Sequence, residues 1–374
     1  MSRRLATVLS VLAVLLAGCT PASAAPARAA VVGTVTLVDN GPAANRITLV
    51  LIGDGYTAGD LPRFRAQAAA TWRALSSVEP FRTYAPFFDV RRVDLVSPES
   101  GLGPDSPLGM HFGCGGTPRL LCADEAAVSH YVGPAVGPEY VIALADSTAY
   151  GGAGGSGVTT LSAGAKDAGS IIQHEMGHTV GGLGDEYDAA PGGQSDFPNL
   201  STQDASAMTS AHAKWWRWLG AADPSGGVVG AYRSANGLYR PTQNSIMRRL
   251  GGVYNLPCRE AVIEALYRRL NSIDAAAPAP RAGPVAPGRT LTVTPLPLAG
   301  GRRLTVRWTV GGRPAPSAAL RDDGLGLDTG ALGLGPHCRA FVRATVVDRT
   351  DWVRDERFRQ ARMRASAVWL VGSF

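Results

Sequence analysis

Short apolar runs alternate with stretches of helical periodicity in the first half of the chain. Residues 47–52, 88–95 and 140–145 are rich in apolar side chains and have the length of buried strands. After the first run, apolar residues recur with the spacing of one helix face. They are Phe64, Ala68, Trp72 and Leu75. This alternation of strands and helices predicts an α/β fold.

The C-terminal part of the chain shows a different pattern, in which apolar and polar residues alternate with period two. Residues 290–293 and 304–308 alternate clearly, and residues 341–347 and 367–371 do so more weakly. Gly- and Pro-containing turns between them are typical of a small immunoglobulin-like β-sandwich. It carries no evident chemistry, so support of the first domain and binding of a surface or substrate are both open.

Composition supports a folded chain and argues against one class of partner. Hydrophobic residues make up 45% of the 374 residues, which suits a globular core and two domains. The net charge of +6 is modest and dispersed, and no basic stripe is interleaved with aromatic residues. We therefore expect no nucleic-acid partner.

The N-terminus predicts export from the cytoplasm. Arg3 and Arg4 precede an apolar stretch that suits a signal peptide and is too short for a membrane span. The lipobox Leu-Ala-Gly-Cys ends at Cys19, which would be lipidated and would anchor the protein at the outer face of the cell membrane. Cleavage at the Ala-Ser-Ala sequence of residues 22–24 is the alternative, and it would release a secreted protein.

The sequence His-Glu-Met-Gly-His at residues 174–178 carries the chemistry. His174 and His178 are four residues apart, so a helix places both imidazoles on one face, one turn apart. This spacing suits two ligands of one Zn²⁺ per chain, and Glu175 suits the general base of a metalloprotease. Whether calcium is also bound is left open.

The third metal ligand is expected just after the helix. Gly181 and Gly182 allow the helix to end and the chain to turn sharply. Metzincins place a third His at the position of Gly184, which has no side chain. A carboxylate also binds zinc, so we predict Asp185 as the ligand, with Glu186 as the fallback.

Several residues further along suit the surroundings of such a site. Ser-Ile-Met at residues 245–247 resembles the tight turn that places a Met, here Met247, under the metal of metzincins. Some metzincins have an oxyanion-binding Tyr two residues after this Met, but Arg249 stands there. Tyr187, Tyr254 and Arg249 are therefore the candidates for oxyanion binding or for support of the ligands.

These motifs, with several others in the same order, resemble the IgA peptidase family of zinc metallopeptidases. The resemblance covers roughly residues 35–275. It includes the apolar strand that ends in Gly-Asp-Gly-Tyr-Thr at residues 53–57, the segments 87–90 and 97–101, and Pro-Cys-Arg-Glu-Ala at residues 257–261. It implies a metzincin-like α/β (α+β) protease fold and a peptide-bond hydrolase.

The predicted organisation follows from these patterns. It comprises a signal peptide (1–18), a disordered tether (19–34), the zinc metallopeptidase domain (35–274), an Ala/Pro-rich semi-rigid linker (275–288) and the immunoglobulin-like β-sandwich (289–374). Residues 158–162 are either the edge strand that binds an extended peptide substrate or a plain surface strand.

The cysteines agree with an exported protein. Apart from Cys19, four remain. Cys114 and Cys122 bracket a short loop, and we predict a disulfide between them. Cys258 and Cys338 either form a second disulfide or are two buried thiols.

The sequence thus predicts an exported zinc endopeptidase that acts on a protein or peptide, in which Glu175 activates a water molecule. Two alternatives stay open. One is a non-catalytic, zinc-stabilised cell-surface binding protein, and the other is a zinc amidase that acts on cell-wall crosslinks. The membrane is expected as a partner only through the lipid anchor, and the oligomeric state is left open.

Overall fold

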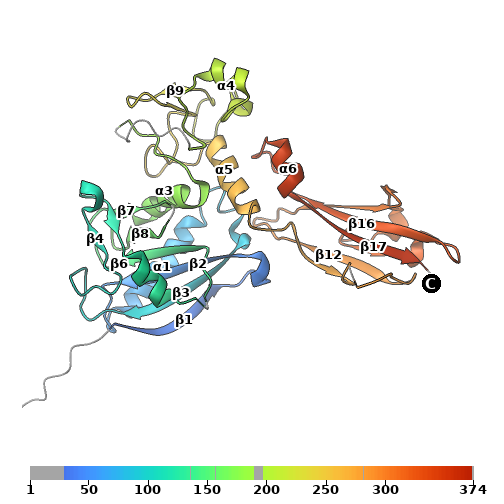
Figure 1. Cartoon of the computed structure of the whole chain (residues 1–374), viewed down its shortest axis with the longest axis horizontal. Helices are drawn as coiled ribbons and strands as arrows, with labels where there is room; N and C mark the ends of the chain where they lie inside the picture. Colours follow the sequence, from blue (N-terminus) through green and yellow to red (C-terminus); the bar gives the residue numbers. More distant parts are fainter. Residues whose placement is uncertain (1–28, 135, 156, 189–196, 281, 373–374) are drawn as a thin grey trace, which may run out of the picture.

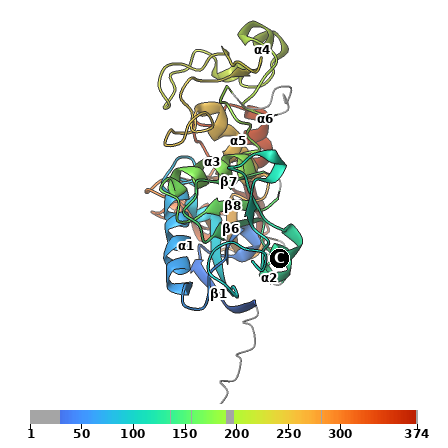
Figure 2. The same ribbon diagram turned by 90° about the vertical axis from the view of Figure 1, so that its left-hand side faces the viewer.

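The first half of the chain is built on a six-stranded sheet (Figures 1 and 2). The computed structural model describes residues 29–134, 136–155, 157–188, 197–280 and 282–372. The strand order is β1 (Ala30–Val38), β3 (Phe88–Val96), β2 (Ile47–Asp54), β6 (Tyr140–Ala145), β8 (Thr159–Ser162) and β7 (Gly152–Ala153). The four central strands are parallel, and β1 and β7 are antiparallel to their neighbours. The mixed α/β fold expected from the apolar runs is confirmed.

Helices cover both faces of this sheet, which explains why β2 is apolar without alternation. The odd-numbered apolar residues of β2 are buried with α1 (Leu61–Leu75) and α3 (Ala168–Gly181). The even-numbered ones are buried with α2 (Glu125–Val132) on the opposite face. Another helix, α5 (Leu256–Tyr267), lies against α3. No helix among the described residues is long and apolar enough to cross a membrane.

Smaller elements surround the end of α3. A hairpin of β4 (His111–Phe112) and β5 (Leu121–Cys122) lies near β7 and β8. The segment between α3 and α5 contains α4 (Ala205–Ala211), β9 (Tyr232–Arg233) and β10 (Tyr239–Arg240). A buried cluster that includes Trp215 and Trp218 holds this segment together, so these two rings serve packing.

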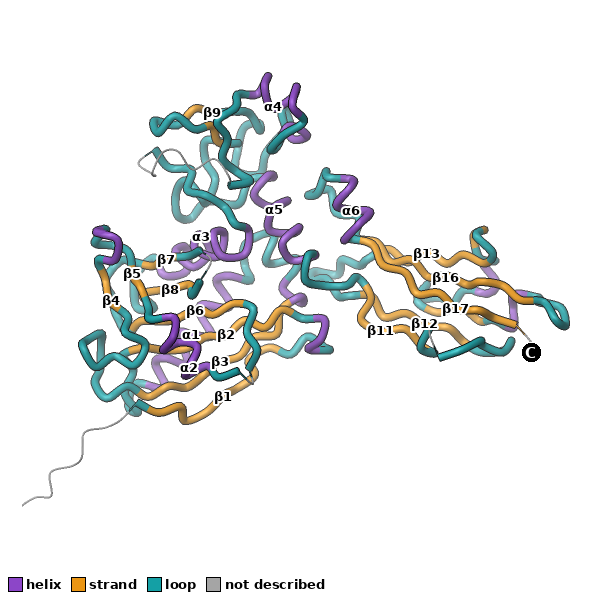
Figure 3. Tube along the Cα trace, in the orientation of Figure 1, coloured by secondary structure: helices purple, strands orange, loops and turns teal. Residues whose placement is uncertain are grey.

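The C-terminal part consists of two antiparallel sheets (Figure 3). One is formed by β11 (Ile273–Ala277), β12 (Thr290–Pro295) and β15 (Gly326–Asp328). The other is formed by β14 (Arg313–Pro314), β13 (Thr305–Val310), β16 (Arg339–Val347) and β17 (Arg364–Gly372). The helix α6 (Glu356–Arg362) connects β16 to β17. Each of the four segments in which apolar and polar residues alternate corresponds to one of these strands, as predicted.

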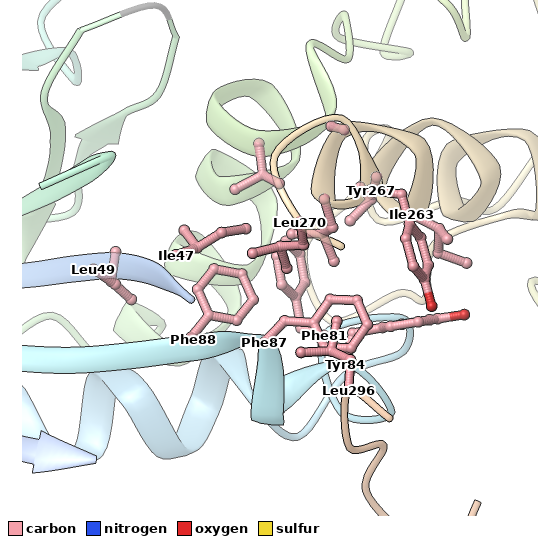
Figure 4. Close-up of a cluster of buried hydrophobic side chains, with 14 of the residues drawn as sticks. Ile47, Leu49, Phe81, Tyr84, Phe87, Phe88, Ile263, Tyr267, Leu270 and Leu296 are labelled. Atoms are coloured by element: carbon pink, nitrogen blue, oxygen red, sulfur yellow. The ribbon is translucent and has the colours of Figure 1, made fainter. Parts of the chain in front are cut away.

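A shared buried cluster joins the two parts of the chain. Figure 4 shows Tyr84 and Phe87, from the segment before β3, close to Tyr267 of α5 and to Leu296. The hydroxyls of Tyr84 and Tyr267 both donate hydrogen bonds to Asp348 Oδ2, each at 2.8 Å. Because these groups are buried, the contact fixes the C-terminal part against α5.

Three sequence predictions about segments need correction. The tether of residues 19–34 does not stay disordered throughout, because β1 begins at Ala30 and pairs with β3. Residues 275–277 of the linker belong to β11, and within the same linker Val285 exchanges backbone hydrogen bonds with Leu370 and Gly372. Both segments pair because their backbone groups lie next to strands that lack partners there. The signal peptide and Cys19 lie outside the described residues.

The predicted edge strand needs the third correction. Residues 158–162 include β8, but β8 is not at the edge of the sheet. The two-residue strand β7 belongs to a glycine-rich loop at residues 151–155 and pairs with β8 through Gly152 and Ala153. The free edge beside α3 therefore belongs to β7.

Candidate metal centre

The helix α3 ends where its glycines predicted. It stops at Gly181, and Gly182 adopts the left-handed conformation with a φ of 59°. The N–H groups of Gly182 and Leu183 donate to the carbonyls of His178 and Gly177. This closure reverses the chain and returns Asp185 to the helix face that carries the two histidines.

Three ligand atoms converge on one point at this face. The Nε2 atoms of His174 and His178 are 3.1 Å apart. Asp185 Oδ1 lies 3.0 Å from His174 Nε2 and 3.3 Å from His178 Nε2. In a tetrahedral zinc site with bonds of about 2.0–2.2 Å, ligand atoms lie about 3.3 Å apart. The triangle is therefore close to the size that Zn²⁺ requires.

The hydrogen bonds of the two imidazoles determine which nitrogen faces this point. His174 Nδ1 lies 3.0 Å from the carbonyl of Ile246, and His178 Nδ1 lies 2.6 Å from that of Leu183. A nitrogen contacts a carbonyl oxygen only as a donor, so both Nδ1 atoms carry the proton. In the neutral imidazoles both Nε2 lone pairs then face the carboxylate, and a cation between these electron-rich atoms would stabilise the arrangement.

The carboxylate of Asp185 fits a metal ligand. Its Oδ1 is buried and has no hydrogen-bond partner among the described residues, although its Oδ2 accepts a hydrogen bond from Tyr187. An unpaired buried oxygen is costly, and coordination of a metal removes the cost. Burial raises the pKa of Asp185, but contacts with His174 and His178 in their protonated form outweigh burial and hold the pKa below its ordinary value.

Glu175 lines the cavity that contains these ligand atoms, which we call the metal cleft, but it is not part of the triangle. It is buried, and one of its carboxylate oxygens and one ring nitrogen of each histidine all lie within 4.8 Å of one another. Burial raises the pKa of Glu175, while the nearby His174 and His178 lower it in part. A carboxylate with a raised pKa beside a metal site suits proton transfer.

Glu186, the fallback ligand, has a different position. Its carboxylate is buried and accepts hydrogen bonds from Ser245 Oγ at 2.5 Å and from Asn199 Nδ2 at 2.9 Å. Its backbone N–H donates to the carbonyl of Met247. Glu186 therefore connects the turn after α3 to the segment around Met247, and Asp185 alone of the two acids faces the histidines.

Met247 lies directly under α3. It is fully buried, and a Cβ added to Gly177 would lie 2.6 Å from its sulfur. The segment also supplies the carbonyl of Ile246 that orients His174. Residue 177 thus has to be glycine, because helix and Met247 approach each other too closely for a larger side chain.

Only one of the three oxyanion candidates lines the cleft. Tyr254 is fully buried and donates its hydroxyl to the carbonyl of Gln173 behind the helix. Arg249 does not line the cleft either. Tyr187 does, with its hydroxyl donating to Asp185 at 2.8 Å.

Arg119 is a cleft residue that the sequence did not reveal. It donates a hydrogen bond of 3.0 Å to the hydroxyl of Tyr187 and lies over its ring. It comes from the loop between Cys114 and Cys122, which form a disulfide as predicted. A lone Arg in a loop carries no motif, so only the spacing of the two cysteines indicated this loop.

The glycine-rich loop forms one wall of the cleft. Gly154 lies so close to the backbone of Glu175 that an added Cβ would meet its carbonyl oxygen at 2.2 Å. The N–H of Gly155 donates to Thr179 Oγ1 of α3. The metal cleft, which the two histidines, Glu175 and Asp185 also line, has a volume of about 540 Å³.

The second disulfide is not formed. Cys258 is buried in α5, where its sulfur lies 3.4 Å from Glu186 Oε1. Cys338 is an exposed free thiol just before β16. The two residues belong to different parts of the fold, and burial raises the pKa of the Cys258 thiol, so it stays protonated.

A family model matches this chain. No curated protein matches the chain. The model of the family described as IgA Peptidase M64 matches residues 35–226, a stretch that begins where the resemblance in the sequence begins. It contains His174, Glu175, His178 and Asp185, whereas Met247 lies beyond it. The match covers more than half of the chain, which therefore belongs to the IgA peptidase M64 family of peptidases.

Proposed function

We propose that this protein is an exported, zinc-dependent endopeptidase with a metzincin-like catalytic domain. The observation that carries the proposal is the convergence of three ligand atoms within 3.0 to 3.3 Å, one of them an otherwise unpaired carboxylate oxygen. His174, His178 and Asp185 would hold the Zn²⁺. When bound, the metal would supply Lewis-acid chemistry, which makes water acidic near neutral pH and polarises a carbonyl oxygen.

The chain's own groups carry the proton transfers. Glu175 accepts a proton from the attacking water and passes it to the nitrogen of the leaving amine. Its raised pKa favours this transfer, because the carboxyl holds the proton between the two steps. Tyr187, whose hydroxyl accepts a hydrogen bond from Arg119, would turn its single proton from Asp185 Oδ2 to the oxygen of the scissile carbonyl.

The free edge of β7 is the natural binding site for an extended peptide. Ala153 of this strand and the following Gly154 and Gly155 line the metal cleft beside Glu175. An added strand would use backbone groups that have no strand partner on that side among the described residues. This arrangement favours a protein or peptide substrate over a small amide.

The N-terminal sequence supports export, either with a lipid on Cys19 or after cleavage at residues 22–24. The disulfide between Cys114 and Cys122 is in keeping with an oxidising compartment. We also infer that the two C-terminal sheets form an immunoglobulin-like β-sandwich, since Leu291 and Leu327 of one sheet and Trp369 of the other belong to one buried cluster.

The decisive experiment measures metal content and casein cleavage for the parent protein and for Glu175→Ala. We expect one zinc per chain in both proteins and a loss of cleavage of about 10²- to 10⁴-fold in the variant. Undiminished cleavage by Glu175→Ala would show that Glu175 is not the general base. The absence of zinc from both proteins would overturn the proposal.

Two other outcomes correspond to the alternatives. Zinc in both proteins with no casein cleavage, but with hydrolysis of peptidoglycan fragments by the parent alone, would identify an amidase of cell-wall crosslinks. Zinc in both with no hydrolysis of either substrate would identify a zinc-stabilised binding protein.

A further inference from the structure

A second cavity lies on the C-terminal part of the chain, away from the metal cleft. It has a volume of about 550 Å³ and is bounded by β13, β16, β17 and α6. The charged side chains that line it are Arg307, Arg343, Arg349, Arg359, Arg364 and Glu356. We call this cavity the arginine groove. Figure 3 shows its sheet on the far side of α5 from α3.

The pairing of the strands explains why these arginines gather. Trp308 and Ala344 are paired neighbours whose side chains belong to the buried cluster. Residues one position away point to the opposite face, so Arg307 and Arg343 both point outward. Arg307 pairs with Thr345, two residues from Arg343, which makes the two arginines diagonal neighbours about 7–8 Å apart.

The guanidinium groups of the groove differ in their partners. Arg359 is held by the backbone carbonyls of Thr350 and Val353, and Arg364 donates to Gln360 of α6. Arg307 and Arg343 make no hydrogen bond or ion pair with any described residue, and neither does Arg349. Like charges close together destabilise a folded protein, and a polyanion in the groove would offset this repulsion.

The chemistry of the groove selects among anions. Five arginines and a single acid, Glu356, line it, so its charged groups are mostly donors. It lies on the face of the sheet, where strand backbones have no free groups, so an extended peptide would find no backbone partners. Phe341 borders it with 64% of its surface exposed, a flat apolar platform of the kind on which sugar rings stack.

We propose that the arginine groove binds an anionic polysaccharide, whose carboxylate, sulfate or phosphate groups pair with Arg307, Arg343 and Arg349. The ligand is rich in acceptors, which matches the donors of the groove, and its sugar rings contact Phe341. This binding is separate from the reaction in the metal cleft and would hold the peptidase at a surface that carries such a polymer.

The test uses the full mature chain and two matched variants. Arg307→Gln/Arg343→Gln removes two charges from the groove. Arg289→Gln/Arg303→Gln removes two exposed charges from the same part of the chain but outside the groove. Calorimetry measures binding to polygalacturonate, to heparin, to neutral dextran and to poly-glutamate. Thermal melting shows that each variant is folded.

We expect both polysaccharide anions to bind the parent and the control, and to bind the groove variant about tenfold more weakly. Dextran should not bind. Equal affinity of parent and groove variant would show that the polyanion binds elsewhere. An equal loss of affinity in the control would show that only the net charge of the protein matters. Either result overturns the proposal, as would absence of binding. Poly-glutamate that binds as tightly as polygalacturonate would overturn it in favour of an acidic peptide.

Discussion

The metal cleft and the arginine groove have nearly the same volume, about 540 and 550 Å³, yet they are built in opposite ways. The ligands of the cleft come from residues 174–185, a stretch formed by one helix and the turn that closes it. The cations of the groove come from three strands and the segment around α6, between residues 307 and 364. One site is local in the sequence, and the other exists only through strand pairing.

The two sites also differ in how their charged groups are satisfied. In the cleft, His174 and His178 are oriented by carbonyls, and Asp185 Oδ1 is the one ligand atom that is buried without a partner. In the groove, Arg307 and Arg343 are exposed to solvent. A buried, oriented site binds strongly and selectively, whereas exposed charges each contribute little and are screened by salt. Substitutions in the cleft should therefore have much larger effects.

The largest effect is expected from loss of a histidine ligand. His178→Ala should lose the zinc and lower peptide cleavage by about 10³-fold or more, because metal and general base act together. His130→Ala, which changes an exposed histidine of α2, should retain both. Zinc content and cleavage rates test this, and a parent that stays active after removal of its metal by a chelator would contradict it.

Substitutions of the neighbouring acids Asp185 and Glu186 should have clearly different effects. Asp185→Asn should weaken zinc binding by more than about 100-fold, since it removes the charge from a ligand. Glu186→Gln should keep the zinc and lower the free energy of unfolding by about 1–3 kcal/mol, because it disturbs buried hydrogen bonds. Metal titration and denaturant unfolding distinguish the two. The reverse pattern would make Glu186 the ligand.

A pH effect on stability should arise in α5, which lies between the two sites. Burial, with a contribution from Glu260, raises the pKa of Glu264 from 4.5 to about 7. The folded state therefore holds this proton more tightly than the unfolded state, so the contribution of Glu264 to stability is fully present below about pH 4.5 and is lost as pH rises through 7. The side chain is 17% exposed, and the shift corresponds to about 3 kcal/mol.

Glu264→Gln should remove this part of the pH dependence. Denaturant unfolding of parent and variant at pH 5 and pH 8 measures it. The parent should lose more stability between the two pH values than the variant, and identical losses would show that Glu264 does not titrate in this range.

The smallest effect is expected from the groove variant on the peptidase reaction. Arg307→Gln/Arg343→Gln should change kcat/KM for a short peptide by less than about twofold, because exposed charges far from the cleft are screened. A larger change, with zinc content unaltered, would show that the two sites are coupled and would weaken the contrast between them.

Much of the metal centre could be predicted from the sequence, because its residues are close together in the chain. The helix carrying His174 and His178, its end at Gly181 and the choice of Asp185 over Glu186 as the residue facing the histidines all follow from local backbone rules, and the geometry agrees. Arg119 was not predicted, because it reaches the cleft from a distant loop. Tyr254 was a candidate for oxyanion binding or for support of the ligands, and it contacts the carbonyl of Gln173 without lining the cleft.

The sequence by itself determined the central strands, the helix that carries His174 and His178, and the disulfide of Cys114 and Cys122, since periodicity and short spacings act within a few residues. Tertiary structure alone decided that β7 covers β8, that the linker pairs with strands and that Cys258 and Cys338 stay apart. It also gathered dispersed arginines into one groove. The physical reason is that backbone pairing and burial depend on which distant segments become neighbours, and one sequence read along its length does not contain that information directly.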